Sequence, residues 1–511
     1  MNAIESENSK NLQSDSFRMY QIDKSRVNKD HPFSKFFTGN KATLLDGTKK
    51  QGIDLRNELL QFYEKYYSAN QMTLAIVGPE PLTKLKKYVE DGFSSIPNRQ
   101  AISPETQWRN VPPYLEGKSI IPSLKHKVEI VPVNDSRQVI LSWPIVYNQE
   151  KEREWQYLKP DNYVSHLIGH EGEGSILSFL KSRGWANGLG ASLDKDSSGF
   201  SRYEVIISLT KSGLDAVDDV CEAVFSYIDM ISRVGVPDYI FDEVLQLDEL
   251  EWRFLEKGDP SSYVQSLVEG MQKYPPSLYV AGPRRVSVNL DNSIWGNTSR
   301  PRSSFESDEQ RKVTKDATFD LFSKLTVENS MMTIFSKSFE GKTDKEEKWY
   351  GTSYRAYPYS SSNLIKWTSC RSASSLGMFL PRPNQFIPTE RGLQAKRSVD
   401  RKLLSKPLSF NDRVTPIKPP QVIGGGKEND RWTVYFKQDD RYGQPKAYLI
   451  FELLTPDAYS TPKAAVLAQL YDLCLSDSLG EYSYDAVLAG LTYNLQVLPR
   501  GVRLTFGGYN E

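Results

Sequence analysis

The chain has 511 residues, which is too many for a single hydrophobic core. A rule of roughly 150 residues per domain predicts two to four domains. Apolar residues make up 39% and charged residues 25%, fractions typical of soluble globular proteins rather than disordered or membrane proteins. Lysine plus arginine and aspartate plus glutamate both number 64, so the formal net charge is zero. This balance argues against a globally basic nucleic-acid-binding protein, and we expect no nucleic-acid partner.

Only three cysteines occur, Cys221, Cys370 and Cys474, and they lie far apart. An odd number of scattered cysteines favours a reducing compartment over a disulfide framework. No apolar run approaches the roughly 20 residues that a transmembrane helix needs. The first residues are polar and acidic, unlike a secretory or mitochondrial targeting segment. We therefore predict a cytoplasmic protein with no membrane partner.

The first 110 residues contain a helix–strand–helix pattern. Residues 3–23 are weakly compatible with a helix, and the apolar spacing of residues 53–70 predicts an amphipathic helix. The short apolar run 72–78, which ends in Gly78 and Pro79, predicts a buried strand, and a helix is predicted over residues 82–93. Residues 96–122, rich in Pro, Ser and Asn, are typical of a connection between domains.

The central part continues with alternating strands and helices, which is typical of an α+β fold. The predicted strands are 127–133, 138–143, 203–210 and 333–336. The predicted helices are 157–167, 175–181, 214–231 and 239–255.

A shift in composition over residues 380–427, with seven prolines and a run of three glycines, predicts a linker. Beyond it we predict strands at 432–435, 447–452 and 502–506 and a helix at 464–479. The chain stops about 80 residues into this region, so we expect its last domain to be incomplete.

Two local patterns admit a functional and a structural interpretation. His166 and His170 have the spacing of two zinc ligands on one helical face, but the catalytic glutamate of a zincin does not lie between them. A helix end is the more ordinary interpretation. The glycine-rich run at residues 172–175 resembles a phosphate loop but lacks the Gly-Lys-Ser/Thr that completes it. No G-x-S-x-G signature of a serine nucleophile occurs.

A series of longer motifs runs along essentially the whole chain. The motifs are His31-Pro32-Phe33-Ser34-Lys35-Phe36, Thr38-Gly39-Asn40, Gly52-Ile53-Asp54-Leu55-Arg56, Leu167-Ile168-Gly169-His170-Glu171-Gly172, Gly184-Trp185, Lys337-Ser338-Phe339-Glu340-Gly341-Lys342-Thr343, Trp349-Tyr350-Gly351-Thr352, Phe386-Ile387-Pro388-Thr389, Phe436-Lys437-Gln438-Asp439-Asp440, Asp477-Ser478-Leu479 with Glu481-Tyr482, Leu488-Ala489-Gly490-Leu491 and Gly508-Tyr509-Asn510. Taken together and in this order, they resemble the insulysin-like members of the M16 metallopeptidase family.

The resemblance implies tandem homologous α+β sandwich domains, each with a mixed or antiparallel sheet packed by helices. Residues 1–110 would be the later part of the catalytic first domain, and residues 111–385 the second, non-catalytic domain. A linker would occupy residues 386–428, and residues 429–511 would open the third domain. On this interpretation the first and last domains are incomplete, and we expect the chain to be part of a longer protein.

The resemblance also implies zinc, held in the family by two histidines of H-x-x-E-H and a later glutamate. Glu7 stands at the position of that glutamate, although by itself it would be an ordinary solvated carboxylate. H-x-x-E-H does not occur in the chain, so we expect no catalytic residue here. Without two imidazoles no zinc-bound water is activated, and the isolated chain should not hydrolyse peptides.

The family resemblance further implies an exosite in the second domain that anchors the N-terminus of a peptide substrate. The matching residues are Gly169, Glu171, Gly188, Leu189, Gly190 and Ala191. A strand edge pairs with an extended peptide, and a carboxylate attracts its α-ammonium. The alternatives are glycines that merely shape a turn and, for the whole chain, a non-catalytic peptide-binding protein. The chain could also be the partner half of a split M16 assembly, and expected partners are peptides, a complementary M16 chain or a second copy.

Overall fold

The computed structural model describes residues 1–256, 258–286, 308–388, 419–426, 431–438 and 444–509. The chain divides into two compact units, residues 1–383 and residues 384–511. Most of the predicted linker, residues 389–418 and 427–428, lies outside the described residues. No helix in the described ranges is both long and apolar enough to cross a bilayer.

The first unit is built on a mixed seven-stranded sheet in the order β3-β4-β2-β5-β1-β7-β6. Only β1 and β5 run parallel within it; the other neighbours are antiparallel. The strands are β1 (His126–Ile130), β2 (Gln138–Val146), β3 (Ala186–Ser197), β4 (Phe200–Leu209), β5 (Met331–Phe335), β6 (Lys345–Glu346) and β7 (Ser353–Pro358).

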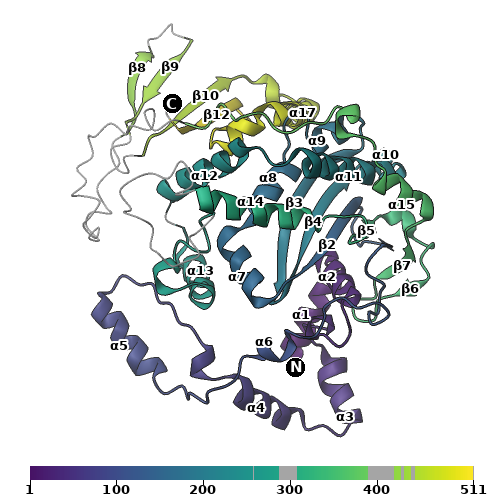
Figure 1. Ribbon diagram of the computed structural model, residues 1–511. Coiled ribbons are helices and arrows are strands. Elements are labelled where there is room, and N and C mark those ends of the chain that lie inside the picture. Colours follow the sequence, from purple (N-terminus) through teal and green to yellow (C-terminus); the bar gives the residue numbers. More distant parts are fainter. Residues whose placement is uncertain (257, 287–307, 389–418, 427–430, 439–443, 510–511) are drawn as a thin grey trace. The chain divides into compact units, whose positions relative to one another are not determined.

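Helices cover one face of this sheet because alternate residues of its strands are apolar. On β2 these residues are Val139, Leu141, Trp143 and Ile145, which all lie in the main hydrophobic core. Figure 1 shows α8, α11 and α14 over this face. The helices of this part are α7 (Gln149–Leu158), α8 (Pro160–Ile168), α9 (Ile176–Ser182), α10 (Lys211–Asp215), α11 (Val217–Val234), α12 (Asp238–Arg253), α13 (Pro260–Lys273), α14 (Asp308–Phe322) and α15 (Ser361–Thr368).

The helix predicted over residues 157–167 is two helices instead. Lys159 adopts the left-handed conformation (φ 46°) and separates α7 from α8. Pro160 follows and takes the first position of α8, where its missing N–H leaves no hydrogen bond unmade. The buried Lys159 ammonium donates to the carbonyl oxygen of Gly282 at 2.5 Å, which ties this corner to a distant loop.

The opposite face of the sheet is covered by α2 (Asp15–Arg26). Ile22 is fully buried there in a small core with Val128 and Ile130. The Arg26 guanidinium is also buried, and it donates to Thr333 Oγ1 at 2.9 Å and to the His126 carbonyl oxygen at 3.0 Å. Polar as well as apolar contacts therefore hold α2 on the sheet.

A buried ionic network lies at the same junction. Arg202 of β4 contacts Asp23 of α2 at 3.5 Å, Asp194 of β3 at 3.2 Å and Glu204 at 3.3 Å. Burial, reinforced by the two neighbouring aspartates, raises the pKa of Glu204 to about 7 although Arg202 opposes the shift. Burial likewise raises the pKa of Asp23. Ser142 of β2 donates to Glu204 at 3.2 Å, so four elements meet at this network.

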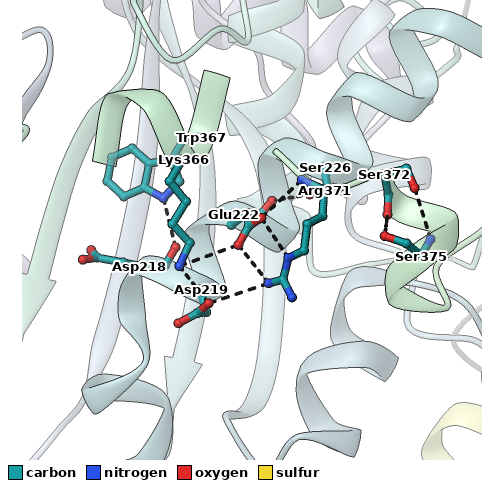
Figure 2. Close-up of polar contacts among 9 residues, drawn as sticks. All are labelled: Asp218, Asp219, Glu222, Ser226, Lys366, Trp367, Arg371, Ser372 and Ser375. Carbon is teal, nitrogen blue, oxygen red and sulfur yellow. Dashed lines mark hydrogen bonds and ion pairs between the residues drawn. The ribbon is translucent and has the colours of Figure 1, made fainter. Parts of the chain in front are cut away.

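A second ionic cluster fastens the segment after β7 to α11 (Figure 2). Arg371 donates to both oxygens of Glu222, at 2.9 and 2.8 Å, and Lys366 lies 2.7 Å from Asp219. Burial would raise the pKa of Glu222, but hydrogen bonds and charge from Arg371, with Lys366, outweigh it and lower that pKa. The Trp367 indole N–H also donates to the Asp218 carbonyl oxygen. These contacts direct residues 361–383 back along the helical face.

The remaining helices near the N-terminus bury little. They are α1 (Asn2–Asn11), α3 (Thr48–Lys50), α4 (Leu55–Tyr66), α5 (Leu82–Phe93) and α6 (Pro104–Trp108). The predicted helix 82–93 agrees with α5, but the predicted strand 72–78 is wrong, since this run has no strand conformation. A strand requires a hydrogen-bonded neighbour, and none pairs with it in the described ranges.

The second unit holds a three-stranded antiparallel sheet, β10-β12-β11, and a separate two-stranded one, β8-β9. Its elements are β8 (Gln421–Gly425), β9 (Thr433–Phe436), β10 (Lys446–Leu454), α17 (Pro462–Leu488), β11 (Thr492–Leu498) and β12 (Gly501–Tyr509). Strand β10 and helix α17 carry many apolar side chains but bury none. The α+β class with mixed sheets packed by helices is thus present in the first unit, where the predicted exosite lies.

Candidate functional site

Strand β3 lies at one end of the seven-stranded sheet, so it pairs with β4 alone in the described part of the chain. Leu189 and Ala191 point into or against the main core. Gly188 and Gly190 face the other way, and a Cβ atom added at either one would meet no atom within 4 Å. The backbone of this edge is therefore accessible at the two glycines.

The loop that follows α8 lies beside this strand because Gly169 allows a close approach. A Cβ atom at Gly169 would stand 2.7 Å from the Ser165 carbonyl oxygen and 3.7 Å from the Ala191 backbone nitrogen. The Gly169 N–H donates to Ser165 at 2.8 Å and ends the helix. The structure thus brings together Gly169 and Ala191, two predicted exosite residues that are 22 positions apart.

Glu171 sits in the same loop, two residues beyond Gly169, with a partly exposed side chain. Its neighbours His170 and Gly172 are buried, and the Gly172 N–H donates to His170 Nδ1 at 3.1 Å. This bond fixes the loop on both sides of Glu171. The loop that carries this partly exposed carboxylate thus lies against β3 at Gly169, and a carboxylate and a strand edge are the groups that suit the charged N-terminus of an extended peptide.

Two other interpretations of this region, zinc binding by His166 and His170 and phosphate binding by residues 172–175, gain no support. The rings of His166 and His170 lie edge to face with centroids 5.9 Å apart. Across the described ranges, no three His, Cys, Asp or Glu side chains are grouped so that they could hold a metal ion. The run 172–175 precedes a helix of only seven residues, and Ser175 Oγ already accepts the N–H of Ser178 at 3.1 Å.

Glu7, the predicted zinc ligand, lies on the exposed side of α1, whose buried residues are Asn8 and Asn11. The described residues bring no histidine or second carboxylate to it in a metal-binding group. They therefore do not fit a complete zinc site, and the role of Glu7 stays a prediction.

Comparisons with known proteins bear on the whole chain. Residues 54–247 match a family model described as "Peptidase M16 inactive domain", and residues 252–511 match "Middle or third domain of peptidase_M16". The chain belongs to the peptidase M16 family. It is 35% identical over 512 residues to the insulin-degrading enzymes of Bos taurus and Homo sapiens. It is 34% identical over 511 residues to the A-factor-processing enzyme of Saccharomyces cerevisiae.

These alignments cover 100% of the chain but only 44% or 45% of each relative, so the chain spans somewhat less than half their length. Among solved structures, pitrilysin matches 100% of this chain and 48% of its own, with a TM-score of 0.71 and 22% identity. That likeness shows a shared fold. The predicted family and fold class are confirmed, while the domain boundaries and site residues stay predictions.

Proposed function

We propose that this M16 chain anchors the N-terminus of peptide substrates for an insulysin-like zinc metalloendopeptidase. The observation that carries the proposal is the accessible edge of β3 beside the loop that holds Glu171. The site comprises Gly169, Glu171, Gly188, Leu189, Gly190 and Ala191. The role proposed for these residues is binding.

An extended peptide would add to β3 as a further strand, with backbone hydrogen bonds along the edge. Gly188 and Gly190 leave room for the peptide backbone and its side chains to approach. The Glu171 carboxylate would meet the α-ammonium group, and such a charge-assisted hydrogen bond is stronger than a neutral one. Anchoring one end raises the local concentration of the rest of the peptide wherever cleavage takes place.

Zinc belongs to the whole enzyme in this proposal. Glu7 would supply one carboxylate ligand, and the histidine ligands and the general base would come from an H-x-x-E-H motif that this sequence does not contain. The chain alone would then bind peptides without hydrolysing them.

The anchoring role is tested with Glu171→Ala, measured by the fluorescence anisotropy of a short peptide labelled at its C-terminus. We expect about tenfold weaker binding of the peptide with a free N-terminus, the size of one lost charge-assisted hydrogen bond. Binding of the same peptide with an acetylated N-terminus should be weak in both proteins. The matched control is Glu173→Ala, because this carboxylate lies in the same loop and its side chain is 70% exposed.

Equal affinity of the Glu171→Ala and unmodified chains for the free peptide would remove the anchoring role. An equal loss in the Glu173→Ala control would indicate general electrostatic attraction instead of a site at Glu171.

A second candidate function is that of a partner half in a split M16 assembly, or a peptide-binding protein without catalysis. The exposed apolar side chains of Leu59 and Phe62 favour it, because they are three residues apart on one face of α4 and exposed apolar surface marks an interaction site. Peptide hydrolysis would be measured with this chain, with a chain bearing H-x-x-E-H, and with both. Hydrolysis only in the mixture supports the split enzyme, and binding without hydrolysis in any sample supports the binding protein.

For the cellular setting we propose the cytoplasm, where thiols stay reduced. All three cysteines are free, with Cys221 buried, Cys370 half-buried and Cys474 exposed. The partners proposed are peptides, together with a complementary M16 chain or a second copy.

A further inference from the structure

The loop that holds Glu171 is contacted by a segment from far along the chain. Residues 378–382 run past residues 172–175, and the Phe379 N–H donates to the Gly174 carbonyl oxygen at 2.9 Å. Arg382 stands 3.8 Å from Glu173, although both side chains are largely exposed and this pair contributes little. The backbone hydrogen bond and the packing of Phe379 are therefore the contacts that matter.

Gly174 and the Phe379 ring fit together without spare room. Gly174 has a φ of +80°, which only glycine adopts without strain. A Cβ atom at this position would lie 2.7 Å from three atoms of the Phe379 ring. The ring thus covers Gly174 directly, and any side chain there would displace it.

Phe379 is itself held by the rigid helical face of the first unit. The Tyr227 hydroxyl on α11 donates to the Phe379 carbonyl oxygen at 3.4 Å, and the Tyr239 hydroxyl on α12 donates to Pro381. Met378, immediately before, is buried in the main core. Phe379 therefore links two packed helices to the loop that holds Glu171.

Glu171 lies between two fixed points of that loop. On one side Gly169 is pressed against β3, and on the other Gly174 is held by Phe379. Between them, the Gly172 N–H donates to His170 Nδ1, and the Gly172 carbonyl oxygen accepts the N–H of Ser175 at 3.2 Å. Removing the Phe379 side chain would release Gly174 from its contact with the ring, and the Glu171 carboxylate could then move relative to the edge of β3.

We propose that Phe379 is a positioning residue of the peptide-anchoring site, acting through Gly174 on the placement of the Glu171 carboxylate. This inference rests on the anchoring role proposed for Glu171. It predicts that selectivity for a free α-ammonium over an acetylated N-terminus depends on a side chain that does not touch the peptide.

The experiment is a double-mutant cycle with Phe379→Ala, Gly174→Ala and the two combined, in the full chain. The readout is the ratio of the affinities for the free and the acetylated peptide, which general loss of stability does not change. Each single substitution should lower this ratio about three- to tenfold. The double variant should lower it by less than the product of the two single effects, because removing the ring relieves the clash with the new methyl group, whereas the backbone strain at φ +80° remains.

Phe379→Leu and Ile365→Ala serve as controls, since leucine retains much of the contact and Ile365 is 68% exposed on α15. The melting temperature of each variant shows whether it folds. An unchanged ratio in Phe379→Ala, while Glu171→Ala lowers it, overturns this inference and leaves the anchoring role intact. An unchanged ratio in Glu171→Ala itself overturns the anchoring role. Effects that multiply in the double variant overturn the link through Gly174.

Discussion

Helices α2 and α4 each have 12 residues and lie close in sequence, yet their surroundings are opposite. The sequence of α4, LRNELLQFYEKY, has a clear apolar stripe and buries no residue. The sequence of α2, DSFRMYQIDKSR, is mostly polar and buries five, including Arg26 and Lys24. Apolar spacing thus indicates a helix, but burial depends on whether the chain supplies a surface for that helix to cover.

The largest difference should appear when arginine is removed from each helix. Arg26→Ala leaves buried carbonyl groups and Thr333 without their donor, and we expect a loss of about 4 kcal/mol in the free energy of unfolding. Arg56→Ala on the exposed α4 should change it by less than about 0.5 kcal/mol. Urea unfolding followed by tryptophan fluorescence measures both. If Arg26→Ala lowered the free energy of unfolding as little as Arg56→Ala, the polar contacts of Arg26 would not be energetically important.

Apolar truncation sharpens the same comparison. Ile22→Ala removes a fully buried side chain from the junction of α2 with the sheet, at a cost of about 3 kcal/mol. Leu59 on α4 is 58% exposed, so Leu59→Ala should cost less than about 0.5 kcal/mol. A large loss in Leu59→Ala would mean that α4 is covered by another surface in solution.

The ionic network beneath α2 should make this junction sensitive to pH. Because the pKa of Glu204 is raised to about 7 in the folded protein from an ordinary 4.5, its contribution favours folding at low pH and is lost as pH rises through 7. Between pH 5 and pH 8, ionisation of Glu204 should lower the free energy of unfolding of the unmodified chain by about 2 kcal/mol, and Glu204→Gln should lack this decrease. The measurement is the unfolding free energy of both proteins across that range.

Asp23 and Asp194 face the same arginine, and the raised pKa of Asp23 acts in the same direction. Parallel pH profiles for Glu204→Gln and the unmodified chain would show that Glu204 titrates near its ordinary pKa.

The smallest effect on stability is expected for Leu59→Glu. This substitution places a charge on exposed apolar surface, so unfolding should change by less than about 0.5 kcal/mol while self-association falls. Sedimentation velocity at several concentrations measures the association. An unchanged profile would exclude this face of α4 from any contact between copies.

The spacing of apolar residues predicts several helices and strands of the first unit correctly. The bounds of α5 agree with the predicted 82–93, and β2, β4 and α11 lie where apolar spacing placed them. Strand β3 was found only through family resemblance, because Gly188, Gly190 and its charged end disrupt any alternation. The predicted strand 72–78 fails since pairing partners are not a property of the run itself.

The candidate site shows the same division. Its glycines and Glu171 could be identified by resemblance, yet nothing local indicates that Phe379 covers Gly174, 205 positions away. The burial of Arg26, Arg202 and Glu204 was equally invisible, because a charged side chain is buried only where distant partners compensate it. Long-range pairing is the information that single-sequence patterns lack.

The place of β5 in the sheet affects how the protein is made. This strand is hydrogen-bonded to both β1 and β2, but the chain from residue 147 to residue 330 separates it from β2. At the usual rates of translation, roughly 10–40 s pass between emergence of β2 and of β5 from the ribosome. During that interval the apolar edges of β1 and β2 have no central neighbour, so the nascent chain is a natural client for ribosome-associated chaperones.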